Sequence, residues 1–207
     1  MPTQADPQPQ PQPEAQPEAQ AGDKKPDRTM TIICRPTLDI ASATPPYSMT
    51  ATPKFYYDSG TPDMAGRVHE DGDIILQPLP SPQGYSNQVD ITVMLDTSLM
   101  VDPEGNHVPG RWAYANEYSG TGPVTGFCWF CRVTNVEKRE YDPAPIEVNG
   151  MSATRISDTE IFMDDNSPAA SPAVGFCLGL VVPQYSNYYI TIDPIITSKT
   201  GLNKPPK

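Results

Sequence analysis

The sequence predicts an all-β protein: an antiparallel β-sandwich of about nine strands, preceded by a disordered N-terminal tail. Proline is the first reason, because 26 of the 207 residues are proline and proline fits only helix starts, turns and strand edges. The second reason is the alternation of short runs rich in Val, Ile, Thr, Tyr and Phe with clusters of Pro, Gly, Asn and Asp, the pattern of strands joined by turns. A mostly helical fold is therefore excluded.

Residues 1–28 form the predicted tail. They contain seven prolines and six glutamines and no aromatic or branched aliphatic side chain. Such a segment cannot bury enough apolar surface to offset the entropy lost on ordering, so we expect an extended chain with polyproline II character. The simplest role is a spacer or solubilising leader, and the alternative is a ligand for an aromatic-lined groove.

Residues 29–207 form the predicted sandwich domain, and three of its segments have clear strand patterns. Along 89–95, apolar residues alternate with more polar ones, so one face should lie in the core. Along 173–182 both faces are apolar or small, which is typical of a central strand covered on both sides. The segment 127–136 begins in the same way and then becomes polar on one face, so its end should emerge from the core.

Weaker patterns predict six further strands. Pro53 makes the segment 49–57 an edge or bulged strand, and the Asp193-Pro194 step interrupts the segment 188–197. About nine strands with connections of varied length favour two packed antiparallel sheets, and one turn of helix is expected at residues 136–140. The six weaker strands span residues 31–34, 49–57, 74–79, 111–118, 159–163 and 188–197.

The charge and hydropathy patterns argue against nucleic acids and membranes as partners. The net charge is -11, and the largest basic cluster after residue 28 is the pair Lys138-Arg139, so no basic patch is available for a phosphate backbone. No apolar run approaches the roughly 18 residues that a membrane span needs. The polar start of the chain has neither the basic nor the apolar region of an export signal, so we expect a soluble chain.

Four cysteines occur, at positions 34, 128, 131 and 177. Cys128 and Cys131 have the CxxC spacing that can hold zinc or a redox disulfide when it lies on a turn. Here the spacing lies within an apolar strand, where residues three apart point to opposite faces, so the two thiols cannot bind one ion together. Since Cys34 and Cys177 also lie in apolar runs, all four thiols are expected to pack as buried groups. No metal or cofactor is predicted.

His69 and His107 are the only histidines, and both lie in polar, turn-like stretches. A catalytic triad needs a nucleophile on a strained elbow near a histidine. The sequence has no GxSxG motif, and the nearest serines, Ser81 and Ser98, lie in ordinary contexts. We therefore predict that the protein is not an enzyme.

Two groups of acidic residues have the composition of calcium loops. In the first, Asp102, Glu104 and Asn106 alternate as oxygen ligands do, but His107 stands where an EF-hand loop has glycine. Because surface turns use the same residue types, solvated turns are the simpler interpretation, and calcium stays an open alternative. The second group consists of Asp158, Glu160, Asp164, Asp165 and Asn166.

The candidate ligand surface consists of Trp112, Tyr114, Tyr118 and Arg111. The three aromatic residues alternate along one face of the segment 111–118, next to the arginine. An exposed aromatic face binds sugar rings or a partner protein through large, rigid contact area. The alternative is that these rings pack into the core.

Two stretches resemble the AidA/PixA family of bacterial inclusion-body proteins. In the first, Gly72-Asp73-Ile74-Ile75 leads through a polar stretch into the strand at 89–95. In the second, the apolar run 175–180 leads to Tyr189-Ile190-Thr191-Ile192-Asp193-Pro194-Ile195-Ile196. The resemblance covers roughly residues 66–198. It implies a cytoplasmic, non-enzymatic β-sandwich linked to population-density control, host association or protein inclusions, and it supplies no catalytic residues.

Three hypotheses for function follow. The first is a soluble interaction or self-assembly protein of the AidA/PixA kind, whose partner is another protein or a second copy of the chain. The second is a carbohydrate- or receptor-binding module, phage-borne or secreted without a cleavable signal, which uses the candidate ligand surface or a calcium loop. A hydrolase that uses one of the two histidines is the third.

Overall fold

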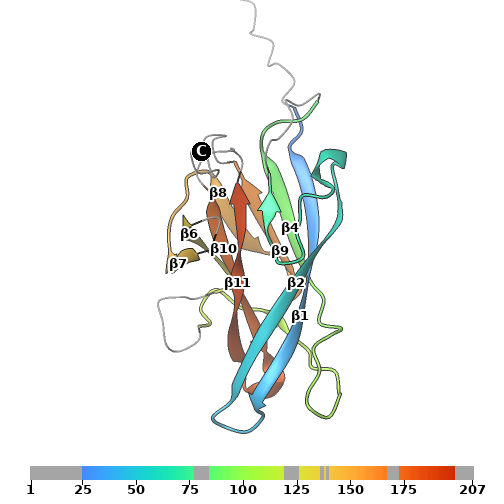
Figure 1. The fold of residues 1–207 in the computed structure, drawn as a ribbon, viewed down its shortest axis with the longest axis vertical. Helices are drawn as coiled ribbons and strands as arrows, with labels where there is room; N and C mark the ends of the chain where they lie inside the picture. The colour runs from blue at the N-terminus through green and yellow to red at the C-terminus, as the bar shows by residue number, and fades with distance from the viewer. Residues whose placement is uncertain are drawn as a thin grey trace, which may run out of the picture.

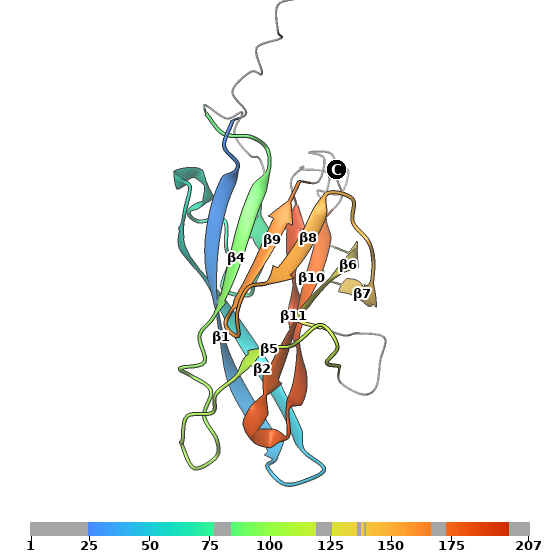
Figure 2. The same ribbon diagram turned by 180° about the vertical axis from the view of Figure 1, so that it is seen from behind.

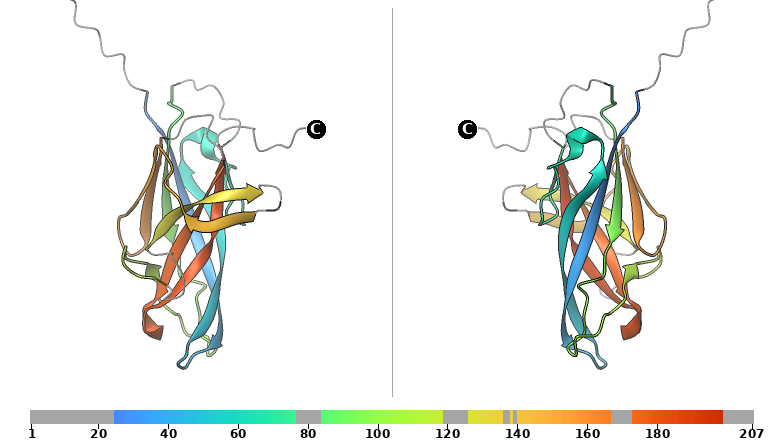
Figure 3. Two further views of the ribbon diagram at one scale, coloured as in Figure 1. Left: turned by 90° about the vertical axis from the view of Figure 1, so that its left-hand side faces the viewer. Right: turned by 90° about the vertical axis from the view of Figure 1, so that its right-hand side faces the viewer.

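The computed structural model describes residues 25–76, 84–118, 126–135, 138, 140–166 and 173–198. These residues form two β-sheets packed as a sandwich (Figure 1). The predicted all-β sandwich is therefore confirmed, with eleven strands in the described residues where about nine were expected. Side views show the two layers and a hairpin, formed by β6 and β7, that projects from one of them (Figure 3).

The first sheet has five strands in the order β2-β1-β4-β9-β8. The β1–β4 pair is parallel, whereas every other neighbouring pair in this sheet is antiparallel. The reason is that β2 brings the chain back to the end where β1 begins, so β4 starts there and runs alongside β1 in the same direction. The bounds are β1 (Arg28–Ser42), β2 (Ser48–Gly60), β4 (Val89–Leu95), β9 (Glu160–Asp165) and β8 (Met151–Arg155).

The second sheet has the order β3-β11-β10-β6-β7, and a short strand, β5, also pairs with β10. Its pairs are antiparallel apart from β3–β11. Two single turns of 3-10 helix, η1 (Pro62–Met64) and η2 (Pro183–Tyr185), lie in the connections. The strand bounds are β3 (Ile74–Ile75), β11 (Tyr188–Ser198), β10 (Val174–Val182), β6 (Cys128–Asn135), β7 (Glu140–Pro145) and β5 (Arg111–Trp112).

The core confirms the face assignments of the two clearest strands. On β4 every second residue is buried, as the alternation predicted. On β10 all nine residues are buried, because one face fills the space between the sheets and the other is covered from outside. Phe176, Leu178 and Leu180 belong to the central cluster. Val181 and Cys177 belong to two smaller clusters on the outer face of the second sheet.

Two expectations differ from the structure, and a third falls largely outside the described residues. The segment 111–118 is a strand only at Arg111–Trp112. The strands β7 and β8 were not predicted, because β7 holds two prolines and β8 lacks a run of apolar residues. The expected turn of helix at residues 136–140 falls largely outside the described residues, and Glu140 begins β7.

The predicted tail, residues 1–28, lies mostly outside the described residues, and its boundary is wrong at Arg28, which is buried and begins β1. This arginine anchors the start of the first sheet. The Arg28 side chain is fully buried, and its Nε donates to Asp63 Oδ2 at 2.6 Å, while its guanidinium also donates to the carbonyl oxygen of Ser86. Burial alone would raise the pKa of Asp63, but the hydrogen bond and charge of Arg28, helped by Thr61, lower it overall. The ion pair therefore links β1 to η1, and the hydrogen bond to Ser86 links β1 to the segment that leads into β4.

Among the described residues, no helix has the length and apolar character needed to cross a lipid bilayer.

Replacing Gly179 on β10 should be strongly destabilising. An added Cβ would lie 2.2 Å from the carbonyl oxygen of Gly126 and 2.4 Å from the Tyr189 hydroxyl oxygen. Because the carbonyl belongs to the backbone and cannot swing away, we expect Gly179→Ala to lower the free energy of unfolding by about 3 kcal/mol. Urea denaturation measures this loss.

Gly110→Ala is the matched control. At this position the nearest atom to an added Cβ is the flexible end of Met100, at 2.9 Å, so a loss of about 1 kcal/mol or less is expected. Equal losses in the two variants would contradict the close approach at Gly179.

Candidate ligand surface

The short strand β5 lies between the two sheets, close to the turn that joins β8 and β9 (Figure 2). Trp112 pairs with Leu180 on β10, and its backbone N–H donates to the carbonyl oxygen of Asp158 at 2.8 Å. Asp158 lies in the turn that joins β8 to β9 in the other sheet. The loop that follows β5 is therefore held by both layers.

The structure separates the residues of the predicted surface. The Trp112 side chain has no exposed surface and belongs to the core, whereas Tyr114 is 46% exposed and Tyr118 57% exposed. The prediction that the three rings share one face is wrong for Trp112. The strand ends at Trp112, and a turn at 115–116 redirects the chain, so the alternation of an extended strand does not continue.

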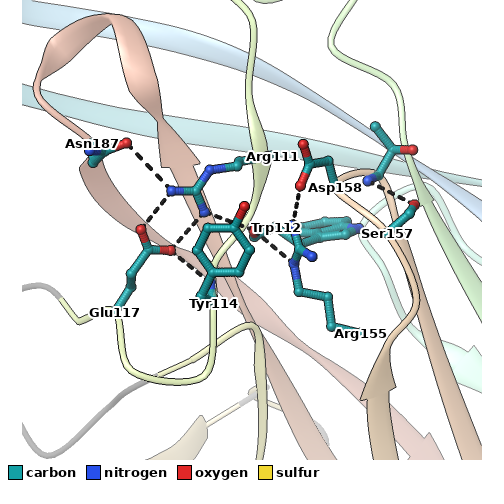
Figure 4. A network of polar contacts seen from close by, with 9 residues as sticks. Arg111, Trp112, Tyr114, Glu117, Arg155, Ser157, Asp158 and Asn187 are labelled. Carbon is teal, nitrogen blue, oxygen red and sulfur yellow. Dashed lines mark hydrogen bonds and ion pairs between the residues drawn. The ribbon is translucent and has the colours of Figure 1, made fainter.

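Arg111 is engaged by a carboxylate of its own loop (Figure 4). Its two terminal nitrogens donate to the two oxygens of Glu117 at 2.7 and 2.6 Å, a bidentate pair. Glu117 Oε2 also accepts the backbone N–H of Tyr114 at 2.6 Å. The Arg111 side chain is only 11% exposed, so it is a structural group of the loop.

The ion pair changes the pKa of both partners. The hydrogen bond from Arg111, together with the backbone hydrogen bond from Tyr114 and the nearby positive charges, lowers the pKa of Glu117 against the opposing effect of burial. The same hydrogen bond raises the pKa of Arg111. Both side chains therefore remain charged at neutral pH.

Two guanidinium groups lie against the Tyr114 ring. The Cζ atoms of Arg111 and Arg155 are 4.3 and 4.4 Å from the ring centroid, within the range of cation–π attraction. Arg155 donates through Nε to the carbonyl oxygen of Trp112 at 3.3 Å and also forms an ion pair with Asp158 (Figure 4). A sugar ring that stacked on Tyr114 would compete with these cations.

The cluster balances its own charges and acts as a clamp. Arg111 and Arg155 are matched by Glu117 and Asp158, and the loop after β5 is thereby fixed to the β8–β9 turn. Sequence reasoning placed Arg111 and Glu117 on the same segment without pairing them, and it missed Arg155 with its partner Asp158 as members of the cluster. An (i, i+6) Arg–Glu spacing across a turn was the only signal for the first pair, and no sequence signal indicates that the β8–β9 turn is close.

Three of the four cysteines are buried as expected, whereas Cys128 is only partly buried. Cys128 packs against the central core and Cys131 belongs to a cluster on the opposite face of β6, so the prediction that they face apart is confirmed. Burial raises the pKa of the Cys128 thiol to about 12 and also raises that of Cys34. Sequence reasoning did not foresee that Cys131 and Cys177 meet, with 3.8 Å between their sulfur atoms.

The two histidines lie in turns, as expected. His69 borders a surface depression of about 430 Å³, beside the exposed ion pair of Lys54 and Glu70. Nε2 of His107 lies 3.2 Å from the hydroxyl oxygen of Thr97 and 3.1 Å from its carbonyl oxygen, on an exposed loop. These contacts hold turns in place.

The first acidic group lies in an exposed turn, which is the simpler of the two interpretations given above. Asp102 accepts hydrogen bonds from the backbone and side-chain amides of Asn106, and these bonds lower the pKa of Asp102. Asp164 and Asp165 belong to β9 and not to a turn, and Asp165 is buried. Within the described ranges, no three His, Cys, Asp or Glu side chains gather in a way that could hold a metal ion.

Comparison with known proteins adds no relative. No protein-family model matches the chain, and searches of curated proteins and of solved structures return no match.

Removing the charge of Glu117 should weaken the fold in a pH-dependent manner. We expect Glu117→Gln to lower the free energy of unfolding at pH 7 by roughly 1–2 kcal/mol, because it breaks a bidentate, largely buried pair. In the folded protein the pKa of Glu117 lies below the ordinary 4.5. The stabilisation by its charge is therefore fully present above pH 4.5 and is lost as the pH falls through the pKa of the folded protein.

The measurement is urea denaturation of both proteins from about pH 7 down to about pH 3, where the difference between them should shrink. Glu104→Gln, on an exposed loop, is the control and should change little. A difference that stays constant over this range would contradict the assigned ion pair.

Proposed function

We propose that this chain is a non-enzymatic interaction protein that associates with a second copy of itself through the edge strand β8. The observation that carries the proposal is that β8 lacks the features that protect the other sheet edges. An edge strand presents unpaired N–H and C=O groups, and proteins normally block such edges with Pro, Lys, bulges or covering loops.

The other edges are protected. On β2, Pro53 and Lys54 lie on the edge, and the N–H of Phe55 is taken by the carbonyl oxygen of Glu70 at 2.9 Å. The edge strand β7 holds two prolines and has two irregularities in its pairing with β6. The remaining edge strand, β3, has only two residues.

The strand β8 has less protection, although at its start the Met151 N–H, on the open side, donates to the carbonyl oxygen of Val148 at 3.1 Å. It contains neither Pro nor Lys, and it pairs with β9 in unbroken register from Met151 to Arg155. In that register, Ile156 N–H donates to the Glu160 carbonyl and Asn166 N–H donates to the Gly150 carbonyl. These are hydrogen-bonded pairs, which alternate along an antiparallel ladder.

The alternation shows which peptide groups face outward. The peptide groups of Ser152 and Thr154 point toward β9, while those of Ala153 and Arg155 point to the open side. Among the described residues, no backbone hydrogen bond reaches Ala153 from the open side. Antiparallel pairing of β8 with the same strand of a second copy would satisfy these groups and extend the sheet across a two-fold axis.

Apolar side chains near β8 support an interface. Ile156, directly after the strand, is 55% exposed, and Tyr114 contacts the neighbouring Arg155.

The wider biological role is also a proposal. The resemblance to the AidA/PixA family supports a cytoplasmic β-sandwich linked to host association, population density or protein inclusions. The exposed ring of Tyr118 favours carbohydrate binding as the second candidate function. A glycan array with the full chain tests that alternative, and saturable binding lost in Tyr118→Ala would support it.

Thr154→Lys tests the edge-strand dimer. This exposed position on β8 would receive the residue that natural edge strands use against pairing, and like charges would face each other across the two-fold axis. We expect sedimentation velocity to show concentration-dependent dimers of the parent chain. The dissociation constant of the variant dimer should be at least tenfold higher than that of the parent. Because the parent carries a net charge of -11, its association should strengthen with added salt.

Thr52→Lys is the matched control, because it makes the same exchange at an exposed position of β2, a protected edge. It should leave the dimer unchanged. A parent chain that stays monomeric at every concentration, or equal effects of the two variants, would overturn the proposal.

A further inference from the structure

Two thiols meet on the outer face of the second sheet. The strands β6 and β10 are antiparallel neighbours, with Cys131 opposite Gly175 and Cys177 opposite Trp129. Cys131 and Cys177 are therefore diagonal cross-strand neighbours on the same face, and their sulfur atoms lie 3.8 Å apart. Diagonal positions are typically about 7–8 Å apart at Cα, so a bond between the sulfurs requires rotation of both side chains and a small approach of the two strands.

The fold leaves each of these thiols one cysteine to react with. Four cysteines allow three pairings, but Cys128 lies on the core face of β6 and Cys34 lies in the core on β1 of the first sheet. Neither belongs to the cluster that holds Cys131 and Cys177. The geometry therefore selects one pairing.

The cover over the two thiols is thin. Trp129 and Tyr141 pack beside them in a small cluster, separate from the central core. Tyr141 comes from β7, an edge strand that pairs with β6. The register of this pairing is irregular before Arg132 and after Val133. The two prolines of β7 cannot donate to the ladder. Local opening of this edge hairpin, which projects from the sandwich (Figure 3), would expose the sulfurs.

We propose that Cys131 and Cys177 form a redox-active dithiol that a small-molecule disulfide oxidises to an intrachain disulfide joining β6 to β10. The Cys131 thiolate attacks one sulfur of the oxidant, forms a mixed disulfide and releases the first small thiolate. The Cys177 thiolate then attacks the Cys131 sulfur, forms the protein disulfide and releases the second. The two protons lost by the cysteines end on the two released thiols, and the oxidant gains both electrons.

The electrostatics assign the first attack to Cys131. The thiol of Cys177 donates a hydrogen bond to the Cys131 sulfur, and this bond lowers the pKa of Cys131 in spite of burial and the nearby Asp142 carboxylate. Burial instead raises the pKa values of Cys34 and Cys128. Because the thiolate is the reacting species, Cys131 should react before the two core thiols.

The test uses the folded full chain, reduced and then incubated with oxidised glutathione. After acid quenching, denaturation and alkylation, mass spectrometry should show that two of the four thiols are lost and that the peptides of Cys131 and Cys177 are linked. Dithiothreitol should restore all four. The variant Cys34→Ala with Cys128→Ala adds no buried polar group and should form the same link as the parent, while Cys177→Ser should form no link and should accumulate glutathione on Cys131.

A second pair of variants tests the role of the cover. Tyr141→Ala should speed the oxidation several-fold, whereas Tyr56→Ala, on β2 of the other sheet, should leave the rate unchanged. Retention of four thiols in both the parent and Tyr141→Ala would overturn the proposal. A link that maps to Cys34 or Cys128 would overturn it as well.

Discussion

The structure depends on the requirement that β10 be buried on both faces. Its inner side chains fill the space between the sheets, and its outer face needs a cover of its own. Tyr189 and Ala113 provide one part of this cover, and Trp129 with Cys131 provides the other. Both sites described above therefore lie next to the same strand: the Arg111 clamp holds the loop that carries Ala113, and the thiol pair lies under the second part of the cover.

Strand periodicity was enough to predict the fold class, the faces of β4 and β10 and the opposite directions of Cys128 and Cys131. It failed where pairing partners, and not side-chain alternation, create the strand. The five residues of β8 form a strand because β9 lies beside them, and β7 forms beside β6 although proline weakens it. Contacts between residues distant in the sequence are set by the order of strands in the sheet. The sequence around Cys177 therefore did not predict that Cys131 lies beside it.

The candidate ligand surface shows the same limit at the level of single residues. An arginine next to aromatic residues is the composition of a binding site, but the same composition stabilises a loop when a carboxylate lies close by. Glu117 makes that difference here, because it takes both terminal nitrogens of Arg111 and the N–H of Tyr114. Trp112 is buried because it lies in β5, which pairs with β10. The strand ends at this residue, so Tyr114 and Tyr118 do not continue on the same face.

The position of β4 between β1 and β9 also has a kinetic consequence. Arg28 pairs with Val89, and Val89 pairs with Asp165, so both ladders of this strand join segments that are far apart along the chain. The hairpins β1–β2 and β8–β9 need only short loop closures and can form early, whereas β4 completes the first sheet when it inserts between them. Such a high contact order slows folding, and until β4 inserts, the inner edges of both hairpins remain open to other chains.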